Sequence, residues 1–274
     1  MTVPVVDARA CETSAVLEVP AHLSPSSINM FRSCPQKYKL AYVDKIKEPP
    51  KWHLHLGSFV HEVLEHLYAL PATERSVDSL RSIAKTRWEE HGWIAKVETL
   101  DEKPGSLGDF KREAFAAMTN LWEIEDPSET HLEAMERQVR VAVDGVTMTG
   151  IIDRLASENG LAVISDYKTG KIPNPRFENG SDENKFFQLL AYALMLEALE
   201  DRRTSRVELL YLSQKKRHAL EVTPAHLAVA RGTIVETREA VDSSAATGEF
   251  HCNVTKLCDW CHYKTTGDCP AFAH

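Results

Sequence analysis

The pattern of apolar and polar positions predicts both helices and strands. Residues 57–70 carry an apolar stripe at helical spacing, with His61 on its polar flank. Similar helical patterns occupy residues 24–31, 36–43, 183–200 and 223–245, and several turn-separated stretches of 71–125. Extended runs rich in β-branched residues occupy 139–143, 146–154, 164–168, 207–212 and 219–222. The pattern therefore predicts a mixed α/β (α+β) fold.

One predicted hairpin brings two acids together. Asn159-Gly160 lies between two extended runs, and Asn-Gly is a strong signal for a two-residue hairpin turn. With this turn, the numbers of paired residues sum to 319, which places Asp153 opposite Asp166. Lys168 lies two residues after Asp166 and therefore shares its face of the strand. The hairpin is expected to present two carboxylates and an amine at one place.

A second predicted hairpin adds a third acid. Asp144-Gly145 is another turn signal, and the paired numbers here sum to 289. Glu136 is then opposite Asp153, whereas Val139, Val141 and Val143 face Gly150, Met148 and Val146 on the apolar side. We therefore add Glu136 as a candidate for the second shell of a metal site or for weak metal binding. A lone acid beside a turn is usually only a surface residue, but the two registers together argue for a site.

This arrangement favours a metal-dependent hydrolytic site. Two like charges directly opposite each other destabilise a strand pair, and a divalent cation between Asp153 and Asp166 would remove that penalty. Carboxylate oxygens suit Mg²⁺ and Mn²⁺, and the Lys168 amine adds positive charge beside them.

Composition limits the classes of function. The net charge of −8 argues against a globally basic nucleic-acid binder but permits a local basic track. No apolar run is long enough to span a membrane, and residues 1–21 do not resemble a signal peptide, so we expect a cytoplasmic protein without membrane association. The chain contains no phosphate-binding loop of an ATP-driven motor.

The cysteines indicate a second metal centre. In a cytoplasmic chain, six cysteines suggest metal or redox chemistry rather than structural disulfides. Three of them are crowded near the end of the chain, as Cys258-x-x-Cys261 followed by Cys269. Four thiolates suit either a [4Fe–4S] cluster or tetrahedral Zn²⁺, and spacing alone does not separate the two.

Several motifs, taken in their order along the chain, resemble the RecB-like nucleases of the PD-(D/E)XK superfamily. The resemblance covers about residues 23–271 and includes the iron–sulfur branch, to which CRISPR-associated adaptation exonucleases and the AddB nuclease domain belong. The motifs are Leu23-Ser24-Pro25-Ser26, Cys34-Pro35, Gly57-x-x-x-His61, Gly150-Ile-Ile-Asp153-Arg, Asp166-Tyr-Lys168, Gln188-x-x-x-Tyr192, Cys258-x-x-Cys261 and Cys269-Pro270.

The resemblance implies a restriction-endonuclease-like core with a central mixed sheet flanked by helices, and N- and C-terminal segments joined at an iron–sulfur cluster. It also implies a role for each matching residue. His61, Asp153, Asp166 and the Tyr167 backbone carbonyl are implied ligands of Mg²⁺ or Mn²⁺. Lys168 is implied to orient the attacking water or to stabilise charge. DNA contacts near the scissile phosphate are implied for Gln188 and Tyr192, and [4Fe–4S] ligation is implied for Cys34, Cys258, Cys261 and Cys269.

One spacing departs from the family pattern. Seven residues separate Cys261 from Cys269, a longer gap than the family usually has. Cys252 is therefore an alternative fourth ligand, and the nearby His262 keeps Zn²⁺ open.

The expected function is a metal-dependent deoxyribonuclease, most simply an exonuclease on single-stranded DNA ends. The alternatives are a structure-selective endonuclease, an iron–sulfur DNA-binding adaptor subunit with an idle nuclease site, and a zinc-binding interaction module. A role in DNA repair or recombination, with a helicase, recombination or CRISPR-adaptation partner, is compatible with the resemblance. The expected organisation is a flexible tail (1–22), an N-terminal segment with one cluster cysteine (23–56), a helical region with the motif histidine (57–130), a nuclease core (131–222) and a C-terminal helix with the cysteine-rich segment (223–274).

Overall fold

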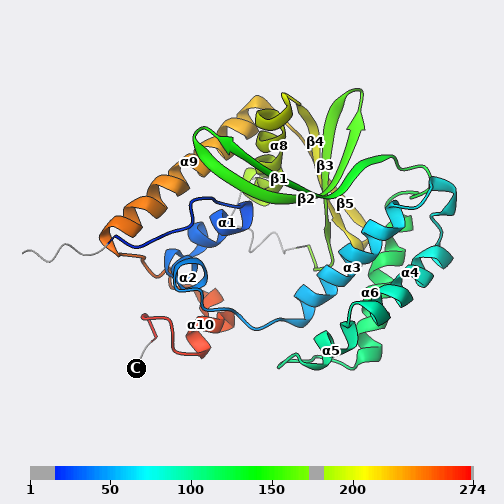
Figure 1. Cartoon of the computed structure of the whole chain (residues 1–274), viewed down its shortest axis with the longest axis horizontal. Coiled ribbons are helices and arrows are strands. Elements are labelled where there is room, and N and C mark those ends of the chain that lie inside the picture. Colours follow the sequence, from blue (N-terminus) through cyan, green and yellow to red (C-terminus); the bar gives the residue numbers. More distant parts are fainter. Residues whose placement is uncertain (1–15, 173–181, 273–274) are drawn as a thin grey trace, which may run out of the picture.

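A five-stranded mixed sheet forms the centre of the chain (Figure 1). The computed structural model describes residues 16–172 and 182–272. The strands follow the sequence order across the sheet, and only the β3–β4 pair is parallel. They are β1 (Leu132–Val143), β2 (Val146–Glu158), β3 (Leu161–Lys168), β4 (Thr204–Tyr211) and β5 (Lys216–Glu221). The predicted mixed sheet flanked by helices is confirmed.

Both predicted hairpin registers are confirmed. Val139 pairs with Gly150 and Arg137 with Ile152, which is the register whose numbers sum to 289. Arg154 pairs with Ser165, which is the register whose numbers sum to 319. The two Asx-Gly turns fix these registers, because Asp144, Gly145, Asn159 and Gly160 all have positive φ, as such hairpin turns require.

Helices α8 and α9 cover one side of the sheet. Helix α8 (Phe187–Glu200) is apolar around most of its circumference, and it packs with Ile164 and Val139 of the sheet and with Ile234 of α9 (Pro224–Thr247) in one core. Such all-round burial is expected of a helix between a sheet and a second helix. The predicted helix 183–200 is in fact two helices, because the chain breaks at Phe186 after the short α7 (Asp182–Lys185).

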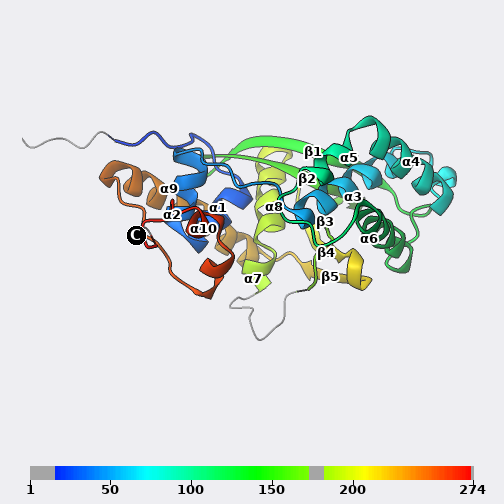
Figure 2. The same cartoon turned by 90° about the horizontal axis from the view of Figure 1, so that it is seen from below.

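A helical lobe forms a second core beyond the sheet (Figures 1 and 2). Tyr167 of β3 and Leu210 of β4 join this core. Its helices are α3 (Trp52–Tyr68), α4 (Val77–Glu90), α5 (Trp93–Glu98) and α6 (Leu107–Thr119). The prediction that α3 begins at Gly57 is wrong, because Trp52 and Leu56 extend the buried stripe by more than one turn. Short 3-10 helices occupy Ala72–Glu74, Asn120–Glu123, Leu212–Gln214 and Lys256–Trp260.

The N-terminal and C-terminal segments lie side by side. Figures 1 and 2 both show α2 (Pro35–Tyr38) near α10 (His262–Thr265). The Gln36 N–H donates to the His251 carbonyl at 3.1 Å, and the Asn253 amide donates to the Ser33 carbonyl at 2.9 Å. Helix α1 (Pro25–Ser33) is capped by the hydroxyl of Ser24, and a π-helix (Lys39–Val43) follows α2.

The described part of the predicted tail contacts α9. The Leu17 N–H donates to the Ala245 carbonyl at 3.0 Å, and Leu17 and Val19 pack against the core. Residues 1–15 of that predicted tail lie outside the described residues. Within the described ranges, none of the helices has the length and apolar character needed to cross a bilayer.

Candidate active site

His61, Glu136 and Asp153 converge where α3 meets the β1–β2 ribbon. Potential ligand atoms of these three side chains all lie within 4.8 Å of one another. Glu136 has a φ of +46°, in the left-handed region that a non-glycine residue adopts only at some energetic cost. The pairs on either side, Met135–Arg154 and Arg137–Ile152, keep the register, so Glu136 remains opposite Asp153. Glu136, which the strand register added to the candidate site, thus lies within this group of potential ligands.

The hydrogen bonds of His61 indicate which ring nitrogen is available to a cation. Nε2 is 2.9 Å from the Tyr167 carbonyl, and because a carbonyl only accepts, Nε2 donates. Nδ1 is 3.4 Å from both Glu136 Oε1 and Asp153 Oδ2. Nδ1 therefore needs a proton or a metal ion to offset the two carboxylates. A backbone carbonyl that orients a ligating histidine is a common feature of metal sites.

The residues present fit a divalent cation. Asp153 Oδ2 is buried and has no hydrogen-bond partner among the described residues. Burial, and next the Asp166 carboxylate, raise the pKa of Asp153 to about 8. Burial lowers the pKa of His61, but the hydrogen bond with Glu136 and the charges of Asp153 and Asp166 outweigh this effect, so the pKa rises overall. Without a bound cation, protons on His61 and Asp153 reduce the repulsion among the carboxylates.

Mn²⁺ affinity is therefore expected to rise with pH. Because the pKa of Asp153 is raised to about 8, this carboxyl carries a proton at neutral pH in the metal-free protein. Binding of the ion displaces that proton, and ligation by Nδ1 of His61, whose pKa is raised to about 9, displaces a second one. Affinity should therefore increase more than tenfold per pH unit between pH 6.5 and 7.5 and level off only above about pH 9. Titration of free Mn²⁺ by electron paramagnetic resonance at each pH measures this. An affinity that is constant over this range would contradict proton–metal competition.

Asp166 and Lys168 form a second pair beside this cluster. Lys168 Nζ is 2.5 Å from Asp166 Oδ2, and the Gln188 amide nitrogen is 3.4 Å from Asp166 Oδ1. Gln188 lies in the first turn of α8 and also reaches the Tyr192 hydroxyl at 3.4 Å. The predicted Gln188–Tyr192 pair thus lies beside the carboxylates. Contact of either residue with DNA stays a prediction, as does metal ligation by the Tyr167 carbonyl, whose oxygen keeps a second lone pair.

Gly150 is required because Tyr192 packs directly on its backbone. A Cβ at position 150 would lie 2.5 Å from Tyr192 Cε1, and that ring is buried between the sheet and α8. The Gly150→Ala variant is therefore expected to lose about 1–3 kcal/mol of unfolding free energy, as measured by urea denaturation. The control is Gly232→Ala in α9, where the nearest atom is 3.9 Å away. Equal stability of the two variants would contradict the close approach.

A buried ion pair lies next to the site. Arg154 Nη2 is 2.8 Å from Glu125 Oε2, and both side chains are less than a tenth exposed. The Tyr68 hydroxyl donates to Glu125 Oε1, and the Arg154 guanidinium lies 5.6 Å from the Tyr68 ring centroid and 5.8 Å from that of Tyr167. This buried group of Tyr68, Glu125, Arg154 and Tyr167 joins α3, which carries His61, to the strands that carry Asp153 and Asp166.

The cysteines that the sequence singled out lie together elsewhere in the fold. Cys34, Cys252, Cys258, Cys261 and Cys269 are half-buried and line one cavity of about 180 Å³ between the N-terminal and C-terminal segments. Cys252 Sγ is 3.8 Å from Cys269 Sγ. Cys252 and Cys269, the two candidates for the fourth cluster ligand, therefore line the same cavity.

Sequence reasoning did not predict the buried ion pair between Arg154 and Glu125. Arg154 follows Asp153 directly, but its partner Glu125 is 29 positions earlier, in a stretch without strand periodicity. It also did not predict that Arg140 lines the same pocket as Glu136, although the register that found Glu136 places Arg140 four residues further along the same strand.

The chain belongs to the PD-(D/E)XK nuclease superfamily. The family model of this name matches residues 22–266, which include the sheet, the convergent carboxylates and Cys34, Cys252, Cys258 and Cys261, but not Cys269. Members of this superfamily use divalent metals, in agreement with the three-residue group at His61.

Two curated phage proteins and one solved structure are similar to the chain. It is 26% identical to the Gene 69 protein of Mycobacterium phage L5 over 91% of its own length and 96% of that protein. It is also 26% identical to the Gene 69 protein of Mycobacterium phage D29 over 57% of its own length. The match covers 65% of that phage protein, so the chain spans slightly under two thirds of it. A structure from Eubacterium rectale, named "Putative exonuclease", shares the fold with a TM-score of 0.54 and 13% identity over 96% of this chain and 94% of that one.

Proposed function

We propose that the protein is a Mg²⁺- or Mn²⁺-dependent deoxyribonuclease that degrades single-stranded DNA from its ends. The observation that carries the proposal is the convergence of His61, Glu136 and Asp153 beside the Asp166–Lys168 pair in a member of a nuclease superfamily. The name of the Eubacterium rectale neighbour favours an exonuclease over an endonuclease.

Each residue has a separate role in phosphodiester hydrolysis. A bound divalent ion would neutralise phosphate charge and lower the pKa of a water molecule. His61 Nδ1, Asp153 and Glu136 would hold the ion, with Asp166 beside them. Lys168 places positive charge where negative charge develops on the phosphate. Burial raises the pKa of Tyr192 to about 12, so its hydroxyl stays protonated and donates hydrogen bonds.

A comparison of circular and linear substrates tests the proposed exonuclease activity. Linear single-stranded DNA of the same sequence should be degraded with Mn²⁺, whereas the covalently closed circle should persist. Degradation of both at equal rates would mean an endonuclease, and degradation of neither would overturn the proposed function.

The same proposal includes a structural [4Fe–4S] cluster held by Cys34, Cys258, Cys261 and Cys269. Tetrahedral Zn²⁺ would need four sulfurs about 3.8 Å apart. Cys252 and Cys269 meet this spacing, but no third histidine, cysteine or acid of the described chain joins them within 4.8 Å. What favours iron over zinc is the resemblance of the cysteine motifs to the iron–sulfur branch of the family. Iron and sulfide content of the purified protein discriminates the two metals.

Loss of one cluster ligand should destabilise the whole fold. Cys258 lies 224 positions after Cys34, so a group bound to both closes a loop that spans most of the chain. We expect Cys258→Ser to lose roughly 4–5 kcal/mol of unfolding free energy from the entropy of closing this loop. Circular dichroism during heating measures the loss. Cys11→Ser is the matched control, and a Cys258→Ser variant with unchanged melting would contradict the structural role.

A further inference from the structure

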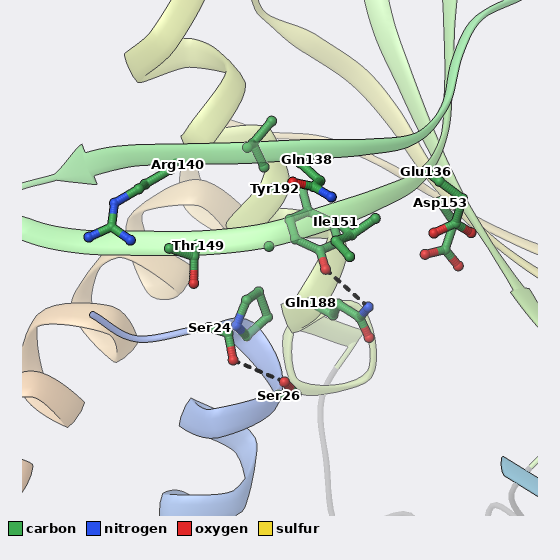
Figure 3. Close-up of a pocket in the computed structure, with 13 residues that line it drawn as sticks. Ser24, Ser26, Glu136, Gln138, Arg140, Thr149, Ile151, Asp153, Gln188 and Tyr192 are labelled. Atoms are coloured by element: carbon green, nitrogen blue, oxygen red, sulfur yellow. Dashed lines mark hydrogen bonds between the residues drawn. The ribbon is translucent and has the colours of Figure 1, made fainter. Parts of the chain in front are cut away.

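An open groove leads away from the carboxylates along the β1–β2 ribbon. It has a volume of about 780 Å³ and continues from Glu136 and Asp153 past Gln138 and Ile151 to Arg140 and Thr149. Figure 3 shows the two acids near one end and Arg140 near the other. The register explains this order, because Gln138 pairs with Ile151 and Arg140 with Thr149. One face of two paired strands thus forms a track that begins at the candidate metal site.

The far end of the groove combines a cation with hydroxyl groups. Arg140 is exposed, and its guanidinium forms no ion pair or hydrogen bond with any residue in the described ranges, although its backbone pairs with Thr149. The first turn of α1 lies across from it, where Ser24, Pro25 and Ser26 line the groove. The Ser24 and Ser26 hydroxyls are 3.0 Å apart, and Figure 3 shows them on the side of the groove that Thr149 faces. Guanidinium groups, hydroxyls and helix N-termini all favour phosphate oxygens.

Backbone hydrogen bonds hold this end of the groove in place. The Leu23 N–H donates to the Thr147 carbonyl at 2.9 Å, and the Thr149 N–H donates to the Leu23 carbonyl at 2.8 Å. Leu23 thereby adds a short parallel bridge to the edge of β2, and the next residue, Ser24, is the N-cap of α1. The hydroxyls of the first turn are therefore fixed relative to Thr149 and Arg140 before any ligand binds.

We infer that the end of the groove at Arg140, Ser24 and Ser26 binds a DNA phosphate one or two linkages away from the one being cleaved, on the same strand. This inference rests on the proposed nuclease function. Four residues of strand span about 13 Å, so Arg140 is too far from Glu136 to contact the reacting phosphate. An extended single strand that follows the groove brings a neighbouring phosphate to Arg140. The subsite fixes the path of the strand rather than the chemistry of cleavage.

Binding and cleavage of a fluorescein-labelled 20-nucleotide oligothymidylate by Arg140→Gln test the inference. The variant should bind about fivefold to tenfold more weakly at 0.1 M salt. The slope of log affinity against log salt should fall by about 0.7, the value for one single-strand phosphate. The turnover number at saturating DNA should stay within twofold of the wild type. The control is Arg112→Gln, an exposed arginine on α6 paired with Asp109, which should change none of these quantities.

Single methylphosphonate substitutions in the oligonucleotide supply a second arm. In the wild type, a neutral linkage one or two positions from the cleaved one should weaken binding. In Arg140→Gln the same linkage should have no further effect, because both changes remove one contact. Unchanged affinity and salt slope in Arg140→Gln, with normal cleavage by the wild type, would overturn the subsite alone. Absence of any DNA cleavage by the wild type with Mn²⁺ would instead overturn the proposed function and the subsite with it.

Discussion

Replacement of Lys168 by alanine is expected to lower the turnover number for DNA about 100-fold to 1,000-fold, the usual range for removal of one group that stabilises transition-state charge. Lys168 Nζ lies 2.5 Å from Asp166 Oδ2, so the amine is fixed at the edge of the carboxylate cluster. The neighbouring metal-site group comprises His61, Glu136 and Asp153. The loss should therefore appear in turnover, and Mn²⁺ affinity should change much less. Single-turnover cleavage of labelled DNA and a parallel Mn²⁺ titration measure the two quantities.

Lys171→Ala is the matched control for Lys168→Ala. Lys171 is exposed and lies three residues further along the chain, beyond the end of β3. It should keep turnover within about twofold of the wild type, so that a general loss of positive charge is separated from the loss at position 168. Turnover of Lys168→Ala within tenfold of the wild type would contradict the role assigned to the amine.

Replacement of Arg154 by leucine is expected to cost about 3–5 kcal/mol of unfolding free energy, because it leaves the buried Glu125 carboxylate without its main cation. The Tm should fall by roughly 10 °C. Nuclease activity below the Tm should also decline, because the Arg154 guanidinium lies against the Tyr167 ring, and the Tyr167 carbonyl accepts the His61 hydrogen bond. Urea denaturation and calorimetry measure the change.

A paired substitution separates charge from packing at this position. Arg154→Leu together with Glu125→Leu removes both buried charges, so it should recover part of the lost stability. Arg112→Leu, at an exposed ion pair, should cost less than about 1 kcal/mol. A loss below 1 kcal/mol in Arg154→Leu alone would mean that the buried pair is not a determinant of stability.

The sheet and the acids could be predicted from the sequence because short-range turn chemistry fixes them. Asp144-Gly145 and Asn159-Gly160 set two registers, and these registers bring Glu136, Asp153 and Asp166 together without any long-range information. The start of α3 was harder to predict. Gly57 suggested a boundary, but burial of Trp52 and Leu56 outweighs the weak helix propensity of one glycine.

The remaining part of the site depends on contacts between distant segments. The approach of His61 to Asp153 requires α3 to dock on the sheet, and the Arg154–Glu125 pair, which contacts Tyr68 of α3, contributes to that docking. Likewise, Ser24 reaches the groove because Leu23 bonds to the edge of β2 more than 120 positions later. Periodicity and spacing do not encode such pairings, and only the resemblance to a family pointed to His61 as a partner of the acids.

The most direct test of the metal-site assignment is cleavage of end-labelled single-stranded DNA by the wild type and by Asp153→Asn, each with Mn²⁺ and with excess EDTA. Asp153 belongs to the convergent group and carries its unpartnered buried oxygen. We predict cleavage by the wild type with Mn²⁺, none with EDTA, and at least a 100-fold loss in the folded Asp153→Asn variant. Undiminished cleavage by Asp153→Asn, or cleavage by the wild type in EDTA, would contradict a metal-dependent nuclease site at these residues.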